Sequence, residues 1–213
     1  MKTVDGRLIV LAGKSRSGKT GYTAQAVQQE QRIIAWDPHD QWGRLRGWKR
    51  FTSMTDLHRA TQTKGPAKLA YVVGSDDIKM RFDQWCQVAL QWGVIYGRCN
   101  IIAEEQADVS TPGKAVGSWG ALLRAALKHN LDVYAISQRW AEADKTAINN
   151  ASEIVCFSMM PQDVAYMAKK SGIDAAELAS LRKLETSTMI TCPYVRLYID
   201  SGRIERSKLT FRK

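Results

Sequence analysis

Short apolar runs alternate with longer amphipathic segments along most of the chain. Six runs are apolar over nearly their whole length, and they span residues 7–12, 32–37, 68–73, 98–105, 132–138 and 153–158. A strand with one solvated face alternates apolar and polar positions, whereas a continuous apolar run indicates burial on both faces. These runs therefore predict the strands of a mostly parallel sheet that is covered on both sides.

Helical segments are predicted between and after these strands, over residues 19–30, 76–96, 117–130 and 161–172. Segment 76–96 has one apolar stripe at steps of three and four residues, formed by Ile78, Phe82, Trp85, Ala89, Trp92 and Tyr96. Such a stripe is typical of a helix that packs on a core. Strands that alternate with helices imply right-handed βαβ crossovers and an α/β fold.

The C-terminal end follows a different pattern. Residues 194–209 alternate apolar and polar positions around Asp200-Ser201-Gly202, which predicts a β-hairpin added to the core. We therefore expect one α/β domain over residues 1–213. Its core would span about residues 7–185, and a hairpin with a basic tail would span about residues 186–213.

Charge and composition restrict the class of protein. The 213 residues carry a formal net charge of +10, which favours polyanionic partners, either nucleic acid or an anionic membrane surface. The four cysteines do not lie at metal-binding spacing, and Cys99 and Cys156 fall in apolar runs, so they are interpreted as buried thiols. The longest uncharged run, residues 85–97, is shorter than the ~20 residues that span a bilayer, so no membrane span is expected.

A glycine-rich phosphate-binding motif follows the first apolar run. Residues 13–20 match G-x-x-x-x-G-K-[ST] in full, as Gly13, Lys14, Ser15, Arg16, Ser17, Gly18, Lys19 and Thr20. Glycines let the backbone wrap a phosphate, and the helix that follows presents unpaired N–H groups to it. Lys19 is expected to reach the β- and γ-phosphates of ATP, and the Thr20 hydroxyl is expected to ligate Mg²⁺.

Polar residues that end two later strands are the candidate catalytic groups. The run at 98–105 ends in Glu104 and Glu105, and the run at 132–138 ends in Gln138. Ligands of open α/β sheets bind at the carboxyl ends of the strands, where these side chains would gather. One carboxylate would hold the magnesium shell, the other would polarise the attacking water, and the amide would sense the γ-phosphate. The alternative is that both strands simply end in solvent.

In order along the chain, these motifs resemble the FtsK–HerA superfamily of DNA-pumping ATPases. The resemblance covers about residues 7–172, and it includes a "DPxxE"-like segment at 33–43. It implies a RecA-like (ASCE) P-loop core that uses ATP and Mg²⁺. Within the superfamily, the compact size resembles the genome-packaging ATPases of tailless, membrane-containing icosahedral viruses, which pump double-stranded DNA into a preformed capsid.

The resemblance also implies roles for single residues. Glu104 would be the metal-associated acid, Glu105 the catalytic base and Gln138 the sensor. The first acid is usually Asp in the family, so the longer Glu104 leaves the division of roles between the two glutamates open. Asp37 is a further candidate near the site, with capping of the turn before Pro38 as the alternative.

Ring ATPases of this kind complete each site with an arginine from the neighbouring subunit. Arg124 is the first candidate here, with Arg139 and Lys128 as others. The implied assembly is a homo-oligomeric ring, a hexamer or pentamer, which can be a monomer in isolation. It would act in the host cytoplasm or at the virion vertex, docked on a capsid vertex or a membrane protein.

Other functions remain open from the sequence. A Zot-like ATPase of phage morphogenesis or export is one, and a small-molecule P-loop kinase or a nucleotide-binding module without turnover are others. DNA contact is expected from basic residues in the loop 107–120, which contains Lys114, or in the basic end 203–213. The basic cluster at 44–50 is interpreted as a solvated face over packed tryptophans.

Overall fold

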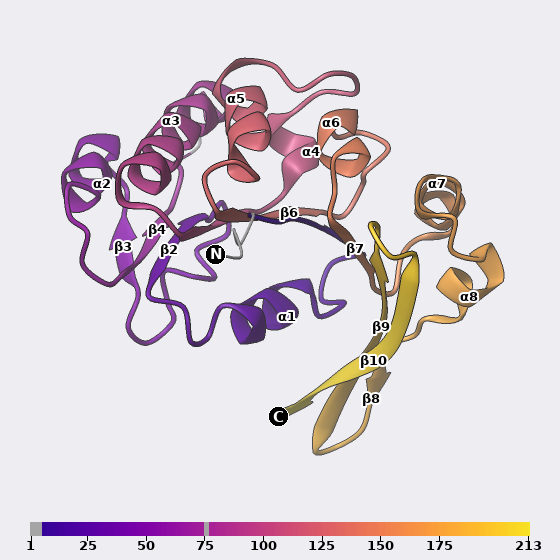
Figure 1. The fold of residues 1–213 in the computed structure, drawn as a ribbon. Coiled ribbons are helices and arrows are strands. Elements are labelled where there is room, and N and C mark those ends of the chain that lie inside the picture. The colour runs from indigo at the N-terminus through magenta and orange to yellow at the C-terminus, as the bar shows by residue number, and fades with distance from the viewer. Residues whose placement is uncertain (1–5, 75–76) are drawn as a thin grey trace.

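The strands of the molecule form one sheet (Figure 1). The computed structural model describes residues 6–74 and 77–213. The strand order is β10-β9-β7-β1-β6-β5-β2-β4-β3, with β8 paired to β9. The strands are β1 (Leu8–Ala12), β2 (Arg32–Trp36), β3 (Lys49–Phe51), β4 (Ala67–Tyr71), β5 (Cys99–Ala103), β6 (Leu131–Ser137), β7 (Glu153–Cys156), β8 (Leu184–Glu185), β9 (Met189–Tyr198) and β10 (Arg203–Arg212).

Most of this sheet is parallel, as the continuous apolar runs predict. The seven strands from β7 to β3 run parallel. β9 pairs antiparallel with β7, and β8 and β10 each pair antiparallel with β9. The six expected strands and the C-terminal hairpin are all present, so the predicted fold class is confirmed. The sequence did not predict β3 or β8, because strands of three and two residues are too short to show a period.

Helices lie on both sides of the sheet. They are α1 (Lys19–Ala26), α2 (Met54–Ala60), α3 (Ile78–Tyr96), α4 (Gln106–Val109), α5 (Gly117–Ala126), α6 (Lys145–Asn149), α7 (Pro161–Ser171) and α8 (Ala175–Ser180). The four predicted helices correspond to α1, α3, α5 and α7, although residue 76, at the predicted start of α3, lies outside the described residues. The sequence missed the other four, which are only four to seven residues long.

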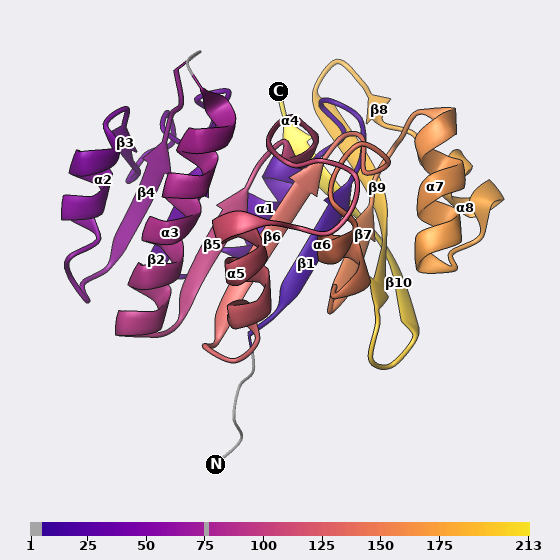
Figure 2. The ribbon, with the colours of Figure 1, turned by 90° about the horizontal axis from the view of Figure 1, so that it is seen from above.

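Two apolar cores fill the space between the sheet and its covering elements. One core lies under α3, α5, α7 and α8, and it buries the predicted stripe of α3 at Phe82, Trp85, Ala89 and Trp92. The helices of this layer cover one face of the sheet from end to end (Figure 2). None of the helices in the described part of the chain is long and apolar enough to cross a membrane.

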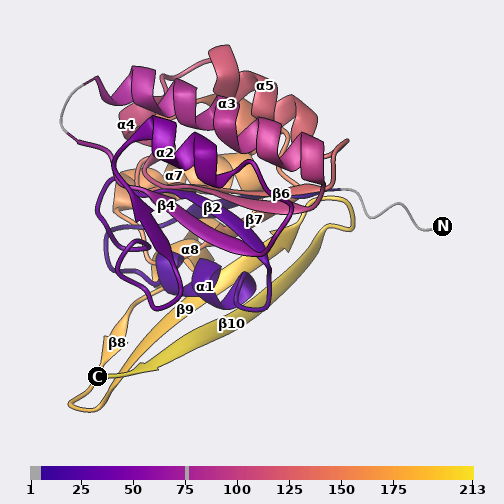
Figure 3. The ribbon, with the colours of Figure 1, turned by 90° about the vertical axis from the view of Figure 1, so that its left-hand side faces the viewer.

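The opposite face is covered mainly by α1 and by the C-terminal hairpin (Figure 3). Its core joins Tyr22 of α1, Trp42 of the loop after β2, and Cys192 and Leu209 of the hairpin. The hairpin approaches α1 closely, because a Cβ atom added at Gly21 would lie 2.5 Å from the ring of Phe211. All four cysteines are buried free thiols, which agrees with the interpretation of Cys99 and Cys156.

The strand register gathers the predicted polar residues at one edge of the sheet. Ala12 at the end of β1 pairs with Ser137 of β6, and Ala103 at the end of β5 pairs with Ala135 of β6. Since all three strands run in the same direction, the residues that follow them leave the sheet side by side. The phosphate loop, Glu104 and Gln138 therefore meet although they are far apart in sequence.

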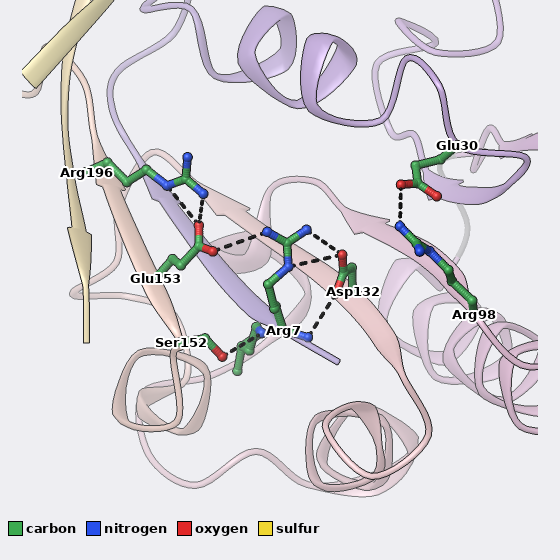
Figure 4. A network of polar contacts seen from close by, with 8 residues as sticks. Arg7, Glu30, Arg98, Asp132, Ser152, Glu153 and Arg196 are labelled. Atoms are coloured by element: carbon green, nitrogen blue, oxygen red, sulfur yellow. Dashed lines mark hydrogen bonds and ion pairs between the residues drawn. The ribbon is translucent and has the colours of Figure 1, made fainter. Parts of the chain in front are cut away.

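A network of ion pairs lies at the opposite edge of the sheet, where β1, β6 and β7 begin (Figure 4). Glu153 of β7 accepts bonds from both Arg196 of β9, at 2.6 and 2.9 Å, and Arg7, at 3.3 Å. Arg7 also pairs with Asp132 of β6 at 2.5 Å. Glu153 is only 5% exposed, so its charge depends on these partners. The network thus ties β9 and the hairpin to the parallel part of the sheet.

We expect Glu153→Ala to lower the free energy of unfolding by about 2 kcal/mol, since it removes the carboxylate partner of the partly buried Arg196, whereas Arg7 keeps Asp132. The control is Glu142→Ala, whose carboxylate pairs with Arg139 in solvent and should contribute less than about 1 kcal/mol. Urea unfolding at pH 7 measures both. Equal losses in the two variants would contradict a stabilising role of the network.

Candidate active site

The phosphate loop joins β1 to α1 in a conformation that requires glycine. A Cβ atom at Gly13 would lie 2.5 Å from Ser17 Oγ and 2.8 Å from Phe157 Cβ, and Gly18 has a φ of 111°. Arg16 also has a positive φ, of 58°. The loop thus curls back toward β1, and its first three variable residues, Lys14, Ser15 and Arg16, are exposed on the rim.

Lys19 is the buried cation of this loop. Its Nζ donates to the carbonyl oxygens of Gly13, at 2.6 Å, and Lys14, at 3.0 Å. Burial lowers the pKa of Lys19, and the nearby carboxylates of Glu105 and Glu104 oppose that shift. An ammonium held mainly by carbonyls can exchange them for phosphate oxygens, which are stronger partners.

The loop also fits a triphosphate in other respects. The side chain of Ser17 is 2% exposed, and its Oγ has no partner within the described residues. An unpaired buried hydroxyl is unfavourable unless a ligand or water completes it. Within a complete phosphate-loop motif, this hydroxyl is suited to a ligand that brings oxygen acceptors, as a phosphate does.

Glu104 leaves β5 and points to the start of α1. Its Oε1 accepts from Trp42 Nε1 at 3.1 Å and lies 3.3 Å from Thr20 Oγ1. Burial raises the pKa of Glu104 to about 7, although the Trp42 bond and the charge of Lys19 lower it in part. A carboxylate and a hydroxyl placed side by side fit Mg²⁺, which takes one or two protein oxygens and completes its shell with phosphate and water.

Glu105 and Gln138 form a second contact at the same edge. Gln138 Nε2 donates to Glu105 Oε1 at 2.7 Å, and His39 Nε2 lies 4.0 Å from the same oxygen. Glu105 has a φ of 49°, in the left-handed region that non-glycine residues rarely adopt. Such strain, about 1–3 kcal/mol, is typical of residues whose direction is functionally constrained.

Asp37 supports the site from behind. Its carboxylate accepts the backbone N–H groups of Gln41 at 2.7 Å and of Trp42 and Gly43 at 2.9 Å. Of the two interpretations of Asp37, the structure shows capping of this loop. The cap places Gln41, which lies 3.1 Å from Thr20 Oγ1, and Trp42, which donates to Glu104, beside the Thr20–Glu104 pair. In the adjoining cluster, Arg44, Arg46, Lys49 and Arg50 are exposed, while Trp42 is buried.

The three candidates for a group that acts on a neighbouring subunit are all exposed. Arg124 is exposed on α5, in the helical layer on the face of the sheet opposite α1. Arg139 follows Gln138 but is exposed and pairs with Glu142 at 3.2 Å. Lys128, after α5, is also exposed. Their assignment as groups that act on a neighbouring subunit stays a prediction.

A cleft of about 690 Å³ opens beside the phosphate loop. Besides loop residues it is lined by His39 and Gln41, and by four residues of the C-terminal region, Lys183, Ile190, Cys192 and Phe211. The sequence did not point to these six residues as part of the site. For His39 and Gln41 a signal existed in the "DPxxE"-like segment, whereas the hairpin residues carry no motif.

In the sheet, β6 lies between β1, which leads into the phosphate loop, and β5, which ends at the two glutamates. This strand order, together with the phosphate loop, defines a RecA-like P-loop nucleoside triphosphatase fold. The chain superposes on the genome packaging NTPase B204 from Sulfolobus turreted icosahedral virus 2 in complex with AMPPCP, with a TM-score of 0.72, 17% identity, and coverage of 94% of this chain and 96% of that chain. It superposes on B204, the DNA-packaging ATPase from Sulfolobus Turreted Icosahedral Virus, with a TM-score of 0.68, 14% identity, and coverage of 97% and 98%.

One sequence relative covers nearly the whole chain. It is Protein P9 of Pseudoalteromonas phage PM2, which is 25% identical over 206 residues, or 95% of this chain and 90% of the phage protein. No protein-family model matches the chain. The structural likeness confirms the RecA-like fold that the motifs imply.

We expect Glu104→Gln to stabilise the protein at pH 8 in the absence of nucleotide and metal. Burial raises the native pKa to about 7 from an ordinary value of 4.5, so the wild-type carboxyl contributes its full stability below pH 4.5 and loses it as the pH rises to about 7. The neutral amide does not titrate. The variant should therefore gain about 1–3 kcal/mol over wild type at pH 8 and little at pH 5.

Urea unfolding in EDTA at the two pH values measures this difference. Glu142→Gln, at an exposed carboxylate, is the matched control and should show the same small difference at both. A Glu104→Gln effect that does not change with pH would show that the carboxyl is not held in an unfavourable site.

Proposed function

We propose that the chain is a magnesium-dependent ATPase that powers translocation of double-stranded DNA, and that it packages a viral genome into a preformed capsid. The observation that carries the proposal is the meeting of Lys19, Thr20 and two strand-end glutamates at one edge of the sheet. One of these glutamates lies beside Thr20, and the other is held by Gln138. The packaging NTPases that share the fold support the choice of substrate.

The residues divide the chemistry between them. Lys19 and the backbone of residues 13–20 would bind the phosphates, and Thr20 with Glu104 would hold Mg²⁺, which would neutralise charge on the phosphate oxygens. Glu105 would accept the proton of the attacking water as general base. Gln138 restrains the Glu105 carboxylate through its bond of 2.7 Å, so that the free oxygen can face the water.

The proposed assembly is a ring in which neighbouring subunits complete each other's sites. Arg124 and Arg139 are both exposed, so the side chain of each is accessible to a neighbouring subunit. An arginine that reaches the transferred phosphate across the interface is worth about 10³–10⁵ in rate. We propose a homo-oligomer, a hexamer or pentamer, that acts in the host cytoplasm or docked at a virion vertex.

Duplex DNA is the proposed partner on grounds of charge. The chain carries a net charge of +10. On β10, the exposed Lys208 and Arg212 lie four positions apart and thus on the same face of the strand. Each phosphate neutralised by such a cation would contribute about 0.9 to the slope of log affinity against log salt.

We expect ATP hydrolysis that duplex DNA stimulates and that Lys19→Ala abolishes. Lys64→Ala is the matched control, because Lys64 is an exposed lysine between α2 and β4, outside the phosphate loop, and its variant should keep most of the activity. Phosphate release with and without DNA at fixed salt measures the effect. Hydrolysis that ignores DNA and accelerates with a nucleoside acceptor would instead identify a small-molecule kinase.

We also expect Glu105→Gln to bind ATP as wild type does and to lose about 100-fold or more of its turnover, because the amide cannot accept the water proton. Asp108→Asn, three residues further on and exposed, is the control and should leave turnover unchanged. Calorimetric ATP binding and steady-state hydrolysis separate the two effects. Wild-type turnover in Glu105→Gln would exclude Glu105 as the base.

A further inference from the structure

The cleft beside the phosphate loop has a polar part and an apolar part. Among the described residues that line it, those of the loop and its flank are polar or glycine, and the apolar side chains are Ile190, Cys192 and Phe211. All three come from the C-terminal hairpin. A nucleotide has the same division, with charged phosphates at one end and a flat base with apolar faces at the other.

The three apolar residues form one continuous surface. Ile190 and Cys192 are two positions apart on β9, so they share a face, and the antiparallel register pairs Phe211 of β10 with Ile190. Side chains that are directly opposite in an antiparallel pair lie in contact range. The surface faces the core under α1, where Cys192 is buried and Ile190 and Phe211 are only partly covered.

This apolar surface lies directly against the phosphate loop and the first turn of α1. A Cβ atom at Gly18 would lie 2.8 Å from Cys192 Cβ, and one at Gly21 would lie 2.5 Å from the Phe211 ring. A ligand whose phosphates occupy the loop would therefore have its other end within reach of the hairpin. Ile190 and Phe211 keep part of their surface open to the cleft, and it is this part that a base can cover.

We propose that the C-terminal hairpin is the base-binding element of the nucleotide site, and that the base packs on the open parts of Ile190 and Phe211. The proposal rests on the proposed function, since it requires a nucleotide in the phosphate loop. Stacking of a base on an aromatic side chain is a substantial and sequence-tolerant source of affinity. It would make the hairpin, which the sequence shows only as an appendage, sensitive to the presence of nucleotide.

The test compares ATP with inorganic tripolyphosphate, which has the phosphates but no base. Titration calorimetry with Mg²⁺ would measure both ligands on wild type and Phe211→Ala. The variant should bind ATP about 10-fold more weakly and tripolyphosphate within about twofold of wild type. Ile204→Ala is the matched control, because Ile204 lies on the same strand but on its other face, and it should change neither affinity.

The remaining outcomes are distinguishable. Equal weakening of both ligands in Phe211→Ala would mean that the ring only supports the loop, and wild-type affinity for both ligands would mean that the base binds elsewhere; both overturn the inference. If thermal unfolding shows that Phe211→Ala is not folded, Phe211→Leu replaces it and should reduce only ATP binding, by a smaller factor. Wild type that binds neither ligand would refute the proposed function itself.

Discussion

The site depends on one constraint, that the strands of a parallel sheet all end at the same edge. Three adjacent strands, β1, β6 and β5, bring an ammonium and two carboxylates there, and Lys19 and Glu104 are both buried. Burial acts against both charges, as the lowered pKa of Lys19 and the raised pKa of Glu104 show. The buried charges at this edge therefore reduce the stability of the ligand-free protein, and bound phosphate and metal would compensate them. Functional sites commonly reduce stability in this way.

At the opposite edge of the sheet, where the parallel strands begin, buried charges are compensated by other side chains. There Arg7, Asp132, Glu153 and Arg196 satisfy one another across four strands. The carboxylate of Glu153 is as buried as that of Glu104, yet it has two arginines as partners. Glu104 has instead an indole N–H, a hydroxyl and a lysine that bonds elsewhere. The difference between the two edges supports the proposed nucleotide and metal site at the edge that contains Glu104.

The two faces of the C-terminal hairpin differ in chemistry, because one is apolar and the other is basic. One face of β9 and β10 packs on α1 and borders the cleft, and the other carries Arg206, which is bound to Glu177 of α8, together with Lys208 and Arg212. If the base packs on the first face and DNA contacts the second, the same two strands would sense both ligands. The hairpin packs closely against the phosphate loop at Gly18 and against α1 at Gly21, where an added Cβ atom would meet Cys192 and Phe211.

The sequence by itself determined the parallel sheet, the phosphate loop, and Glu104, Glu105 and Gln138 as its companions. These follow from local patterns, since the loop is one contiguous motif and each of the other residues directly ends an apolar run. The sequence left two interpretations of Asp37, a site residue or a capping residue. The structure shows that its carboxylate accepts three backbone N–H groups and caps the loop that follows β2. Only the tertiary structure placed His39, Gln41 and the hairpin residues in the cleft. Their positions depend on strand order and on the antiparallel addition of β9 beside β7, and neither the period of a segment nor its composition encodes which strands become neighbours.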